Sequence, residues 1–176
     1  MTAQPGAEAF LPDSRSLPNL RTVARECQGC DLYQDAEQTV FGAGNADAVS
    51  MFVGEQPGDQ EDRGGEPFVG PAGRLLDRAL EEAGIDCELT YVTHAVKHFK
   101  FTRAERGKRR IHKEARPHRD RRLPSLLTAE LHAVDPDVVV CLGATPRPRR
   151  HCWDVAGYVL APRQPSQIRD QLGRGQ

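Results

Sequence analysis

The stretch between residues 53 and 76 constrains the fold of this chain more than any other, because it joins an apolar run to a helix through a polar loop. It reads VGEQPGDQEDRGGEPFVGPAGRLL. The apolar segment 48–54 predicts a buried strand, and residues 71–83 predict a helix that begins at a proline and ends before Gly84. Open α/β sheets place their ligands at such strand-to-helix loops. We therefore interpret the loop as a binding site rather than a plain surface loop.

The rest of the chain supplies further elements of the same kind. Residues 89–95 predict a second strand, residues 125–133 a helix and residues 138–142 a third strand, while residues 17–26 carry apolar positions at helical spacing. A strand, helix and strand of these lengths form a parallel crossover unit. We expect an α/β protein, a three-layer α/β/α sandwich around a central, mostly parallel sheet.

The ends of the chain look different from its middle. A chain of 176 residues suits a single domain, which we place at residues 17–144. Residues 1–16 are polar and contain two prolines, which predicts a disordered N-terminus. After residue 144 prolines and arginines crowd together, and only a short strand at Tyr158–Leu160 is discernible. We expect residues 145–176 to be a divergent, poorly ordered tail and the C-terminal portion of the fold to be incomplete.

Hydropathy argues against a membrane protein. The mean hydropathy is -0.59, and no apolar run approaches the roughly 20 residues of a membrane span. The first residues lack a basic segment followed by an apolar one, as a secretory leader would have. We expect a cytoplasmic protein with no membrane partner.

The charges are distributed unevenly. The net charge is -1, yet residues 97–122 contain twelve Lys or Arg against three acidic residues. A basic block inside an otherwise acidic chain indicates a polyanion partner, and we expect nucleic acid. The alternative is a solvated linker.

Cysteine spacing points to a metal site. Of the five cysteines, Cys27 and Cys30 have the spacing of metal ligands. In a cytosolic chain such a pair indicates a metal, an iron–sulfur cluster or a redox centre rather than a disulfide. Because the pair follows a predicted helix and not a strand, we favour the metal or the cluster. Cys141 lies inside an apolar run and is expected to be a core residue.

Several motifs together resemble a known family. The runs GEQPGDQED and PFVGPAGRLLDRAL resemble the first motif and the following helix of the uracil-DNA glycosylase superfamily, in its iron–sulfur (family 4) branch. The run VKHFKFTR with KRRIH is similar to the UdgX-type proteins, which form a covalent adduct with the DNA they attack. The resemblance implies a DNA-repair glycosidase that flips uracil out of single-stranded or opened DNA, cleaves the N-glycosidic bond and traps the sugar covalently through a His.

The residues in the loop suit that chemistry. Phe68 is a candidate for stacking on the flipped base, although the pattern alone fits a core residue equally well. Gln56, through its side chain or its backbone amide, is a candidate for holding a uracil carbonyl. Removal of the base leaves positive charge on the sugar, which Glu55 and Asp59 are placed to stabilise, either directly or as the base for a nucleophile.

The basic block contains the predicted nucleophile. The resemblance implies that His112 attacks the anomeric carbon of the sugar and stays bonded to it. Arg110 and the neighbouring cations would lower the pKa of that His and bind the flanking phosphates. Without the resemblance, a His in a basic run is more typical of a phosphate contact.

The resemblance also implies a 4Fe-4S cluster. Its ligands would be Cys27, Cys30 and His98, the last at a position where family 4 members have Cys, and a His ligand is acceptable at such a cluster. A fourth Cys is expected upstream of the helix that precedes residues 135–140. The segment HRDRRLPSLL contains none, so the fourth ligand is not found.

Two further departures concern the base pocket. His94, which we count among the substrate-binding residues, stands where the family usually has an Asn that reads the uracil edge, and an imidazole lacks the paired donor and acceptor of an amide. The late His-Pro-Ser motif of the family is absent, and APRQPSQIRD is no substitute. The alternatives are therefore a non-catalytic nucleic-acid-binding module or a decayed, frameshifted family member.

Overall fold

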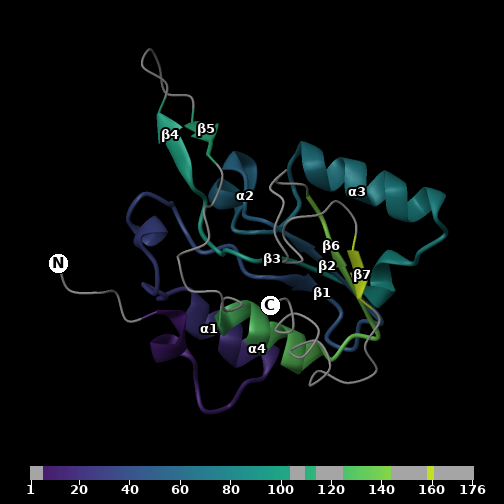
Figure 1. Cartoon of the computed structure of the whole chain (residues 1–176), viewed down its shortest axis with the longest axis horizontal. Helices are drawn as coiled ribbons and strands as arrows, with labels where there is room; N and C mark the ends of the chain where they lie inside the picture. The colour runs from purple at the N-terminus through teal and green to yellow at the C-terminus, as the bar shows by residue number, and fades with distance from the viewer. Residues whose placement is uncertain (1–5, 104–109, 114–124, 144–157, 161–176) are drawn as a thin grey trace, which may run out of the picture.

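The structure is a computed structural model that describes residues 6–103, 110–113, 125–143 and 158–160 (Figure 1). For residues 103, 112 and 158–160 it describes the backbone alone. The helices are η1 (Ala7–Phe10), α1 (Leu17–Ala24), η2 (Asp31–Gln34), α2 (Asp59–Gly64), α3 (Pro71–Glu82), η3 (Cys87–Leu89) and α4 (Ser125–Val134), where η marks a 3-10 helix. The strands are β1 (Ala43–Gly44), β2 (Ser50–Gly54), β3 (Thr90–His94), β4 (Phe101–Arg103), β5 (Arg110–His112), β6 (Val138–Cys141) and β7 (Tyr158–Leu160).

A mixed sheet lies at the centre of the molecule, with the described strands in the order β1-β3-β2-β6-β7. The inner strands β3, β2 and β6 run parallel, whereas β1 and β7 pair antiparallel at the edges. The register places Gly54 beside His94 and Val53 beside Cys141. The expected α/β fold with a parallel centre is confirmed. Because β2 and β3 are parallel neighbours whose last residues are paired, the loop that follows β2 emerges beside the end of β3.

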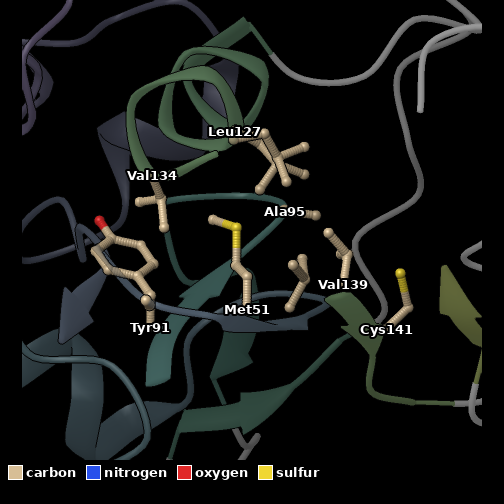
Figure 2. Close-up of a cluster of buried hydrophobic side chains, with 10 residues drawn as sticks. Met51, Tyr91, Ala95, Leu127, Val134, Val139 and Cys141 are labelled. Carbon is tan, nitrogen blue, oxygen red and sulfur yellow. The ribbon is translucent and has the colours of Figure 1, made fainter. Parts of the chain in front are cut away.

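Helices cover both faces of this sheet, α1 and α4 on one side and α3 on the other (Figure 1). Successive residues of a strand point to opposite faces. Met51 and Val53 of β2 accordingly pack with Leu127 of α4 in one buried cluster (Figure 2). Phe52, between them, packs with Leu76 of α3 in another. The three-layer arrangement is therefore confirmed.

Local signals explain where the main helices begin and end. Pro71 occupies the first turn of α3, where its missing N–H is not needed. Gly84 follows the helix with φ 67°, a conformation that glycine adopts without strain. Both α1 and α4 lie within about two residues of their expected bounds. In the described part of the chain, no helix combines the length and the apolar character needed to cross a membrane.

The two ends of the chain are only partly described. Residues 6–16 differ from the expected disorder, because η1 and Leu11 pack against the apolar cluster of α1 and α4, with Phe10 among the contacts. In the predicted tail the expected short strand is present as β7, which pairs with β6. The remaining residues of both end segments lie outside the described part, so the predicted order of the tail stays a prediction.

A separate hairpin, β4–β5, projects from the sheet beyond α2 (Figure 1). Its strands pair antiparallel, with Phe101 opposite His112 and Arg103 opposite Arg110. The hairpin therefore carries part of the basic block to the edge at which β2 and β3 end.

Candidate functional site

The loops after β2 and β3 are hydrogen-bonded to each other at the carboxyl edge of the sheet. The Ala95 amide donates to the Gly54 carbonyl over 2.8 Å, and the Val96 amide donates to the Glu55 carbonyl over 3.0 Å. These bonds extend the parallel pairing of β2 with β3 beyond the strands. Glu55 is half-buried at this edge. The predicted carboxylate and the residues that follow β3 are thus neighbours.

A short helix, α2, fills much of the loop that the sequence predicted. The amide of Gly58, just before the helix, donates a short hydrogen bond to Glu61 Oε2, and this bond caps the first turn. Gly65 ends the helix with φ 74°. Sequence reasoning missed α2, because the stretch has no apolar periodicity. The spacing of Gly58 and Glu61 is the signal that could have predicted it.

Phe68 and His94 form a stacked aromatic pair at the same edge. Their ring centroids lie 4.7 Å apart and their planes differ by 9°. Phe68 has φ 58°, a region that bulky residues rarely adopt. Two glycines make room for the pair: a Cβ at Gly54 would lie 2.7 Å from His94 Cδ2, and one at Gly73 would lie 1.4 Å from the Phe68 carbonyl oxygen. The position of Phe68 therefore depends on close contacts of both its ring and its backbone.

The imidazole of His94 is buried and neutral. The residue is 4% exposed, and Nδ1 has no hydrogen-bond partner among the described residues. Burial, and after it the charge of Lys97, lowers the pKa of His94 from 6.5 to about 3. One ring nitrogen is then a donor and the other an acceptor. Because buried polar atoms are nearly always paired, the unpaired Nδ1 marks a group that is placed to meet a ligand.

Lys97 and Glu130 form a buried ion pair on the α4 side of the sheet. Their side chains are 4% and 0% exposed. Lys97 Nζ also donates to Thr93 Oγ1 over 2.6 Å and to the His94 carbonyl oxygen over 2.8 Å. All three hydrogens of the ammonium group thereby have acceptors. The pair fixes the backbone at the end of β3, where His94 lies.

Glu130 has further partners that complete this network. Its Oε1 accepts hydrogen bonds from the Gly42 amide over 3.0 Å and from the Tyr91 hydroxyl over 3.1 Å. Burial, and after it the charge of Glu130, raises the pKa of Tyr91, so that the phenol stays a donor. Sequence reasoning missed this network and counted Lys97 with the basic block. A lone carboxylate among the apolar residues of α4 is the signal that could have found it.

The side chain of Gln56 binds the base of the β4–β5 hairpin. Its Nε2 donates to the Lys113 carbonyl over 2.8 Å, and its Oε1 accepts from the Lys100 amide over 3.2 Å. The Lys113 amide in turn donates to the Lys100 carbonyl over 3.0 Å. Both ends of the side-chain amide therefore position the hairpin. The side-chain NH2 group has two hydrogens, so a hydrogen bond to a uracil carbonyl would use the hydrogen that does not bond to Lys113.

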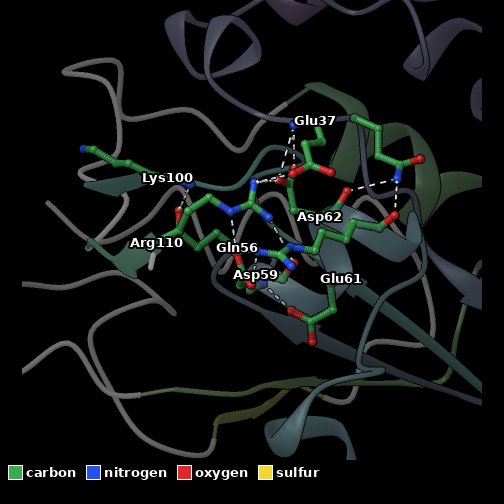
Figure 3. A network of polar contacts seen from close by, with 10 residues as sticks. Glu37, Gln56, Asp59, Glu61, Asp62, Lys100 and Arg110 are labelled. Carbon is green, nitrogen blue, oxygen red and sulfur yellow. Dashed lines mark hydrogen bonds and ion pairs between the residues drawn. The ribbon is translucent and has the colours of Figure 1, made fainter. Parts of the chain in front are cut away.

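Arg110 joins the same hairpin to α2 (Figure 3). Its guanidinium contacts Asp59, and Nη1 lies 2.6 Å from Asp62 Oδ2 and 3.1 Å from Glu37 Oε1. The guanidinium carbon lies 5.0 Å from the centre of the Phe101 ring. The sequence analysis expected Arg110 to bind substrate. The structure places its side chain, 8% exposed, against the acidic residues of α2.

His112, the last residue of β5, lies between two anchored residues, Arg110 at the start of the strand and Lys113 just after it. Arg110 is bound to α2 on one side, and the Lys113 carbonyl is bound to Gln56 on the other. The backbone of His112 is thus fixed close to the loop after β2. Residues 104–109 and 114–122 of the basic block lie outside the described part of the chain.

Cys30 and His98 lie close together, as the ligand prediction requires. Cys30 Sγ is 3.7 Å from His98 Nδ1, and Thr39 Oγ1 is 2.9 Å from His98 Nε2, an arrangement that orients the ring toward the thiol. Burial raises the pKa of both the Cys27 and the Cys30 thiols. The donor types suit a cluster, but in the described ranges no three His, Cys, Asp or Glu side chains gather closely enough to hold a metal ion. The position expected for a fourth ligand falls mainly on residues outside the described part of the chain.

The structure therefore brings most of the predicted catalytic and substrate-binding residues to one edge of the sheet. They are Glu55, Gln56, Asp59, Phe68 and His94. An aromatic ring and a neutral imidazole can bind a flat polar molecule, and a nearby carboxylate can stabilise positive charge that develops on it.

Comparison with known proteins identifies the family. The sequence model of the uracil DNA glycosylase superfamily matches residues 41–170. The type-4 uracil-DNA glycosylase of Thermotoga maritima is 36% identical over 121 residues, which are 69% of this chain and 58% of that protein. The type-4 uracil-DNA glycosylase of Archaeoglobus fulgidus is 35% identical over 130 residues, which are 72% of this chain and 61% of that protein.

The chain thus spans about three fifths of the length of these two curated relatives. The superfamily match covers well over half of the chain. It includes β2, the loop after it, α3 and β3, which are the elements that position Phe68 and His94. The chain therefore belongs to the uracil DNA glycosylase superfamily.

Proposed function

We propose that this protein acts on uracil in DNA as a uracil-DNA glycosylase, a DNA-repair hydrolase that cleaves the N-glycosidic bond. Membership of the superfamily supports the proposal, as do two relatives named for this activity. The observation that carries it is the meeting of Glu55, Phe68 and His94 at the edge where β2 and β3 end. The substrate is uracil-containing DNA, single-stranded or with the base flipped out of the duplex.

The side chains divide the work of the reaction. Phe68 offers its ring to the base, and His94 offers the unpaired Nδ1 to an edge of the base. Glu55 stabilises the positive charge that develops on the sugar as the bond breaks. Asp59 contacts Arg110 and Arg63, so it supports this charge from a distance and holds the hairpin in position.

We further propose that His112 forms the covalent bond that the UdgX-type resemblance implies. A neutral imidazole nitrogen gives its lone pair to the anomeric carbon, while the bond to the base breaks and its electron pair leaves with the uracil. The other ring nitrogen then releases its proton, and the uracil anion takes one up. The support is positional: the backbone of His112 is held between the anchored Arg110 and Lys113.

The proposal includes a 4Fe-4S cluster held by Cys27, Cys30 and His98, for which a fourth ligand is not found. Such a cluster would serve as a structural tie between the segment after α1 and the loop after β3. Iron and sulfide analysis with visible absorbance, after anaerobic purification, tests it. Cys30→Ser should lose the iron, whereas Cys87→Ser, at an exposed cysteine, should keep it. An iron-free wild-type protein would contradict this part of the proposal.

A DNA assay tests the activity. The protein is mixed with a single-stranded oligonucleotide that contains one uracil, and with the same oligonucleotide carrying thymine. We expect release of uracil and a protein–DNA adduct that survives a denaturing gel. His112→Ala should abolish the adduct, whereas His132→Ala, at an exposed histidine of α4, should leave it unchanged. Glu55→Gln should slow uracil release by about a hundred-fold or more.

The outcomes separate the competing functions. An adduct that persists in His112→Ala would overturn the assignment of the nucleophile. Absence of both adduct and free uracil would contradict catalysis. Salt-sensitive DNA binding without either product would favour the non-catalytic module, since phosphate contacts alone produce that dependence.

A further inference from the structure

One ring face of Phe68 is already covered in the free protein. The imidazole of His94 lies parallel to it, with centroids 4.7 Å apart. Gly54 permits this approach, because a Cβ there would lie 2.7 Å from His94 Cδ2 and 3.0 Å from Phe68 Cζ. A flat base that stacked on this face would need the space in which the imidazole lies.

We propose that His94 is an internal occupant of the stacking face of Phe68 and thereby determines which bases this protein accepts. A base must displace the imidazole, and it must then offer a hydrogen bond to Nδ1. This inference rests on the proposed function, because it concerns how that site admits its base.

Simple core packing does not explain the pair. An apolar side chain would fill the same space without burying an unpaired nitrogen, a burial that is costly. The residue is 4% exposed and Nδ1 has no partner among the described residues. Phe68 also keeps φ 58°, a strained conformation for a bulky residue. Strain and an unsatisfied polar atom at one spot are typical of a binding site.

The backbone around His94 suits a ring that moves while its main chain stays in place. Lys97 Nζ donates to the His94 carbonyl over 2.8 Å and is itself paired with Glu130. On the other side the Ala95 amide donates to the Gly54 carbonyl over 2.8 Å. Rotation about the side-chain bonds of His94 can therefore uncover Phe68 and leave these backbone hydrogen bonds intact. The displaced ring remains attached at the end of β3, beside the base that replaces it.

Selection follows from the chemistry of the ring. Burial leaves the imidazole neutral, so Nδ1 is either a donor or an acceptor, according to the tautomer. A single atom of this kind meets one atom of the base edge, whereas an amide would meet two. The affinity for a free base is in addition reduced by the fraction of molecules in which the imidazole covers Phe68.

Titration with free uracil tests the inference, with binding measured by calorimetry on the full chain. His94→Asn uncovers the face of Phe68 and keeps a hydrogen-bonding side chain beside it, so it should tighten uracil binding by roughly two- to ten-fold, the effect of removing one aromatic stack. Val92→Ala is the matched control, since Val92 lies in the same strand and packs against the same apolar cluster as Phe68 but contributes no ring to the stack. It should leave the affinity unchanged.

Proton NMR of the wild-type protein supplies a second readout that needs no variant. The ring protons of His94 should be shifted upfield by Phe68 in the free protein, and uracil should remove that shift. A shift that persists in the complex, or is absent from the free protein, would overturn the inference. So would uracil affinities that are equal in wild type and His94→Asn.

The two proposals fail separately. Uracil release from DNA with equal affinities in wild type and His94→Asn would refute the internal occupant and leave the glycosylase activity standing. Tighter uracil binding by His94→Asn in a protein that does not act on DNA would support the occupant and refute the activity.

Discussion

Thr93 and His94 are neighbours in β3, and the polar groups on the two sides of the strand are satisfied very differently. On the Thr93 side, Lys97 and Glu130 are buried and bonded to each other and to surrounding groups. On the His94 side, a buried ring nitrogen has no partner among the described residues. We infer that the polar groups on the Thr93 side are paired with one another and stabilise the fold, whereas the ring nitrogen on the His94 side is available to a ligand.

Removal of Glu130 is the most severe test of this contrast. Glu130→Ala would leave Lys97 buried without its counter-ion, and we expect a loss of about 3–5 kcal/mol in the free energy of unfolding. Urea denaturation measures the loss. The double variant Lys97→Met/Glu130→Leu removes both charges and should recover much of it, because the penalty comes from the unpaired charge. A loss below about 1 kcal/mol in the single variant would show that this side is not completed by its ion pair.

Arg110 allows the next test, because its network is charged but only partly buried. Arg110→Ala should reduce the free energy of unfolding by about 2–3 kcal/mol, since Asp62 is fully buried and would lose its cation. The β4–β5 hairpin would lose its contact with α2, so the adduct assigned to His112 should form more slowly. Denaturation and a time course of adduct formation measure the two effects. Normal adduct formation in Arg110→Ala would refute the positioning role.

The pH dependence of stability probes the His94 side. The pKa of about 3 in the fold lies below the ordinary 6.5, so the unfolded chain takes up the proton first as the pH falls. The contribution of the neutral ring to the free energy of unfolding is complete above pH 6.5 and is lost as the pH falls toward 3. When the pH is lowered from about 7.5 to about 5, the free energy of unfolding of wild type should therefore fall by about 2 kcal/mol more than that of His94→Asn. Urea denaturation at the two pH values measures the difference. Equal losses would show that the imidazole is protonated in the fold and is not the neutral group inferred here.

Removal of an exposed ion pair should change the free energy of unfolding least. Arg63 lies 3.1 Å from Asp59 within α2, but its side chain is 58% exposed. Arg63→Ala should change the free energy of unfolding by less than about 0.5 kcal/mol, because water screens such pairs. A thermal or urea denaturation curve is sufficient to measure it. A change as large as that of Arg110→Ala would mean that exposure does not separate the two groups of charges.

The layers of this fold could be predicted because their signals are local. The inner strands β2 and β6 are short, nearly continuous apolar runs, and α3 is bounded by Pro71 and Gly84. Such patterns report burial directly, without knowledge of the partner. The predicted strand ends also placed Glu55 and His94 at one edge.

The polar interior could not be predicted in the same way, because it depends on pairings between distant residues. Lys97 and Arg110 were counted with a basic block for nucleic acid, yet one faces Glu130 and the other faces Asp59 and Asp62. Nothing in the local sequence distinguishes a lysine with a buried partner from a lysine in solvent. For the same reason the sequence predicted Phe68 as a stacking ring and did not predict that His94 covers it.

The Lys97–Glu130 pair also has a consequence for the order in which the chain is made. Lys97 leaves the ribosome 33 residues before Glu130. During that interval β2 and β3 have been synthesised, but the ammonium group has no counter-ion and stays hydrated. We therefore expect the end of β3, and His94 with it, to take its final position only after α4 has been synthesised and has docked. A nascent chain arrested before α4 should be sensitive to protease at this point, and one arrested well beyond β6 should resist.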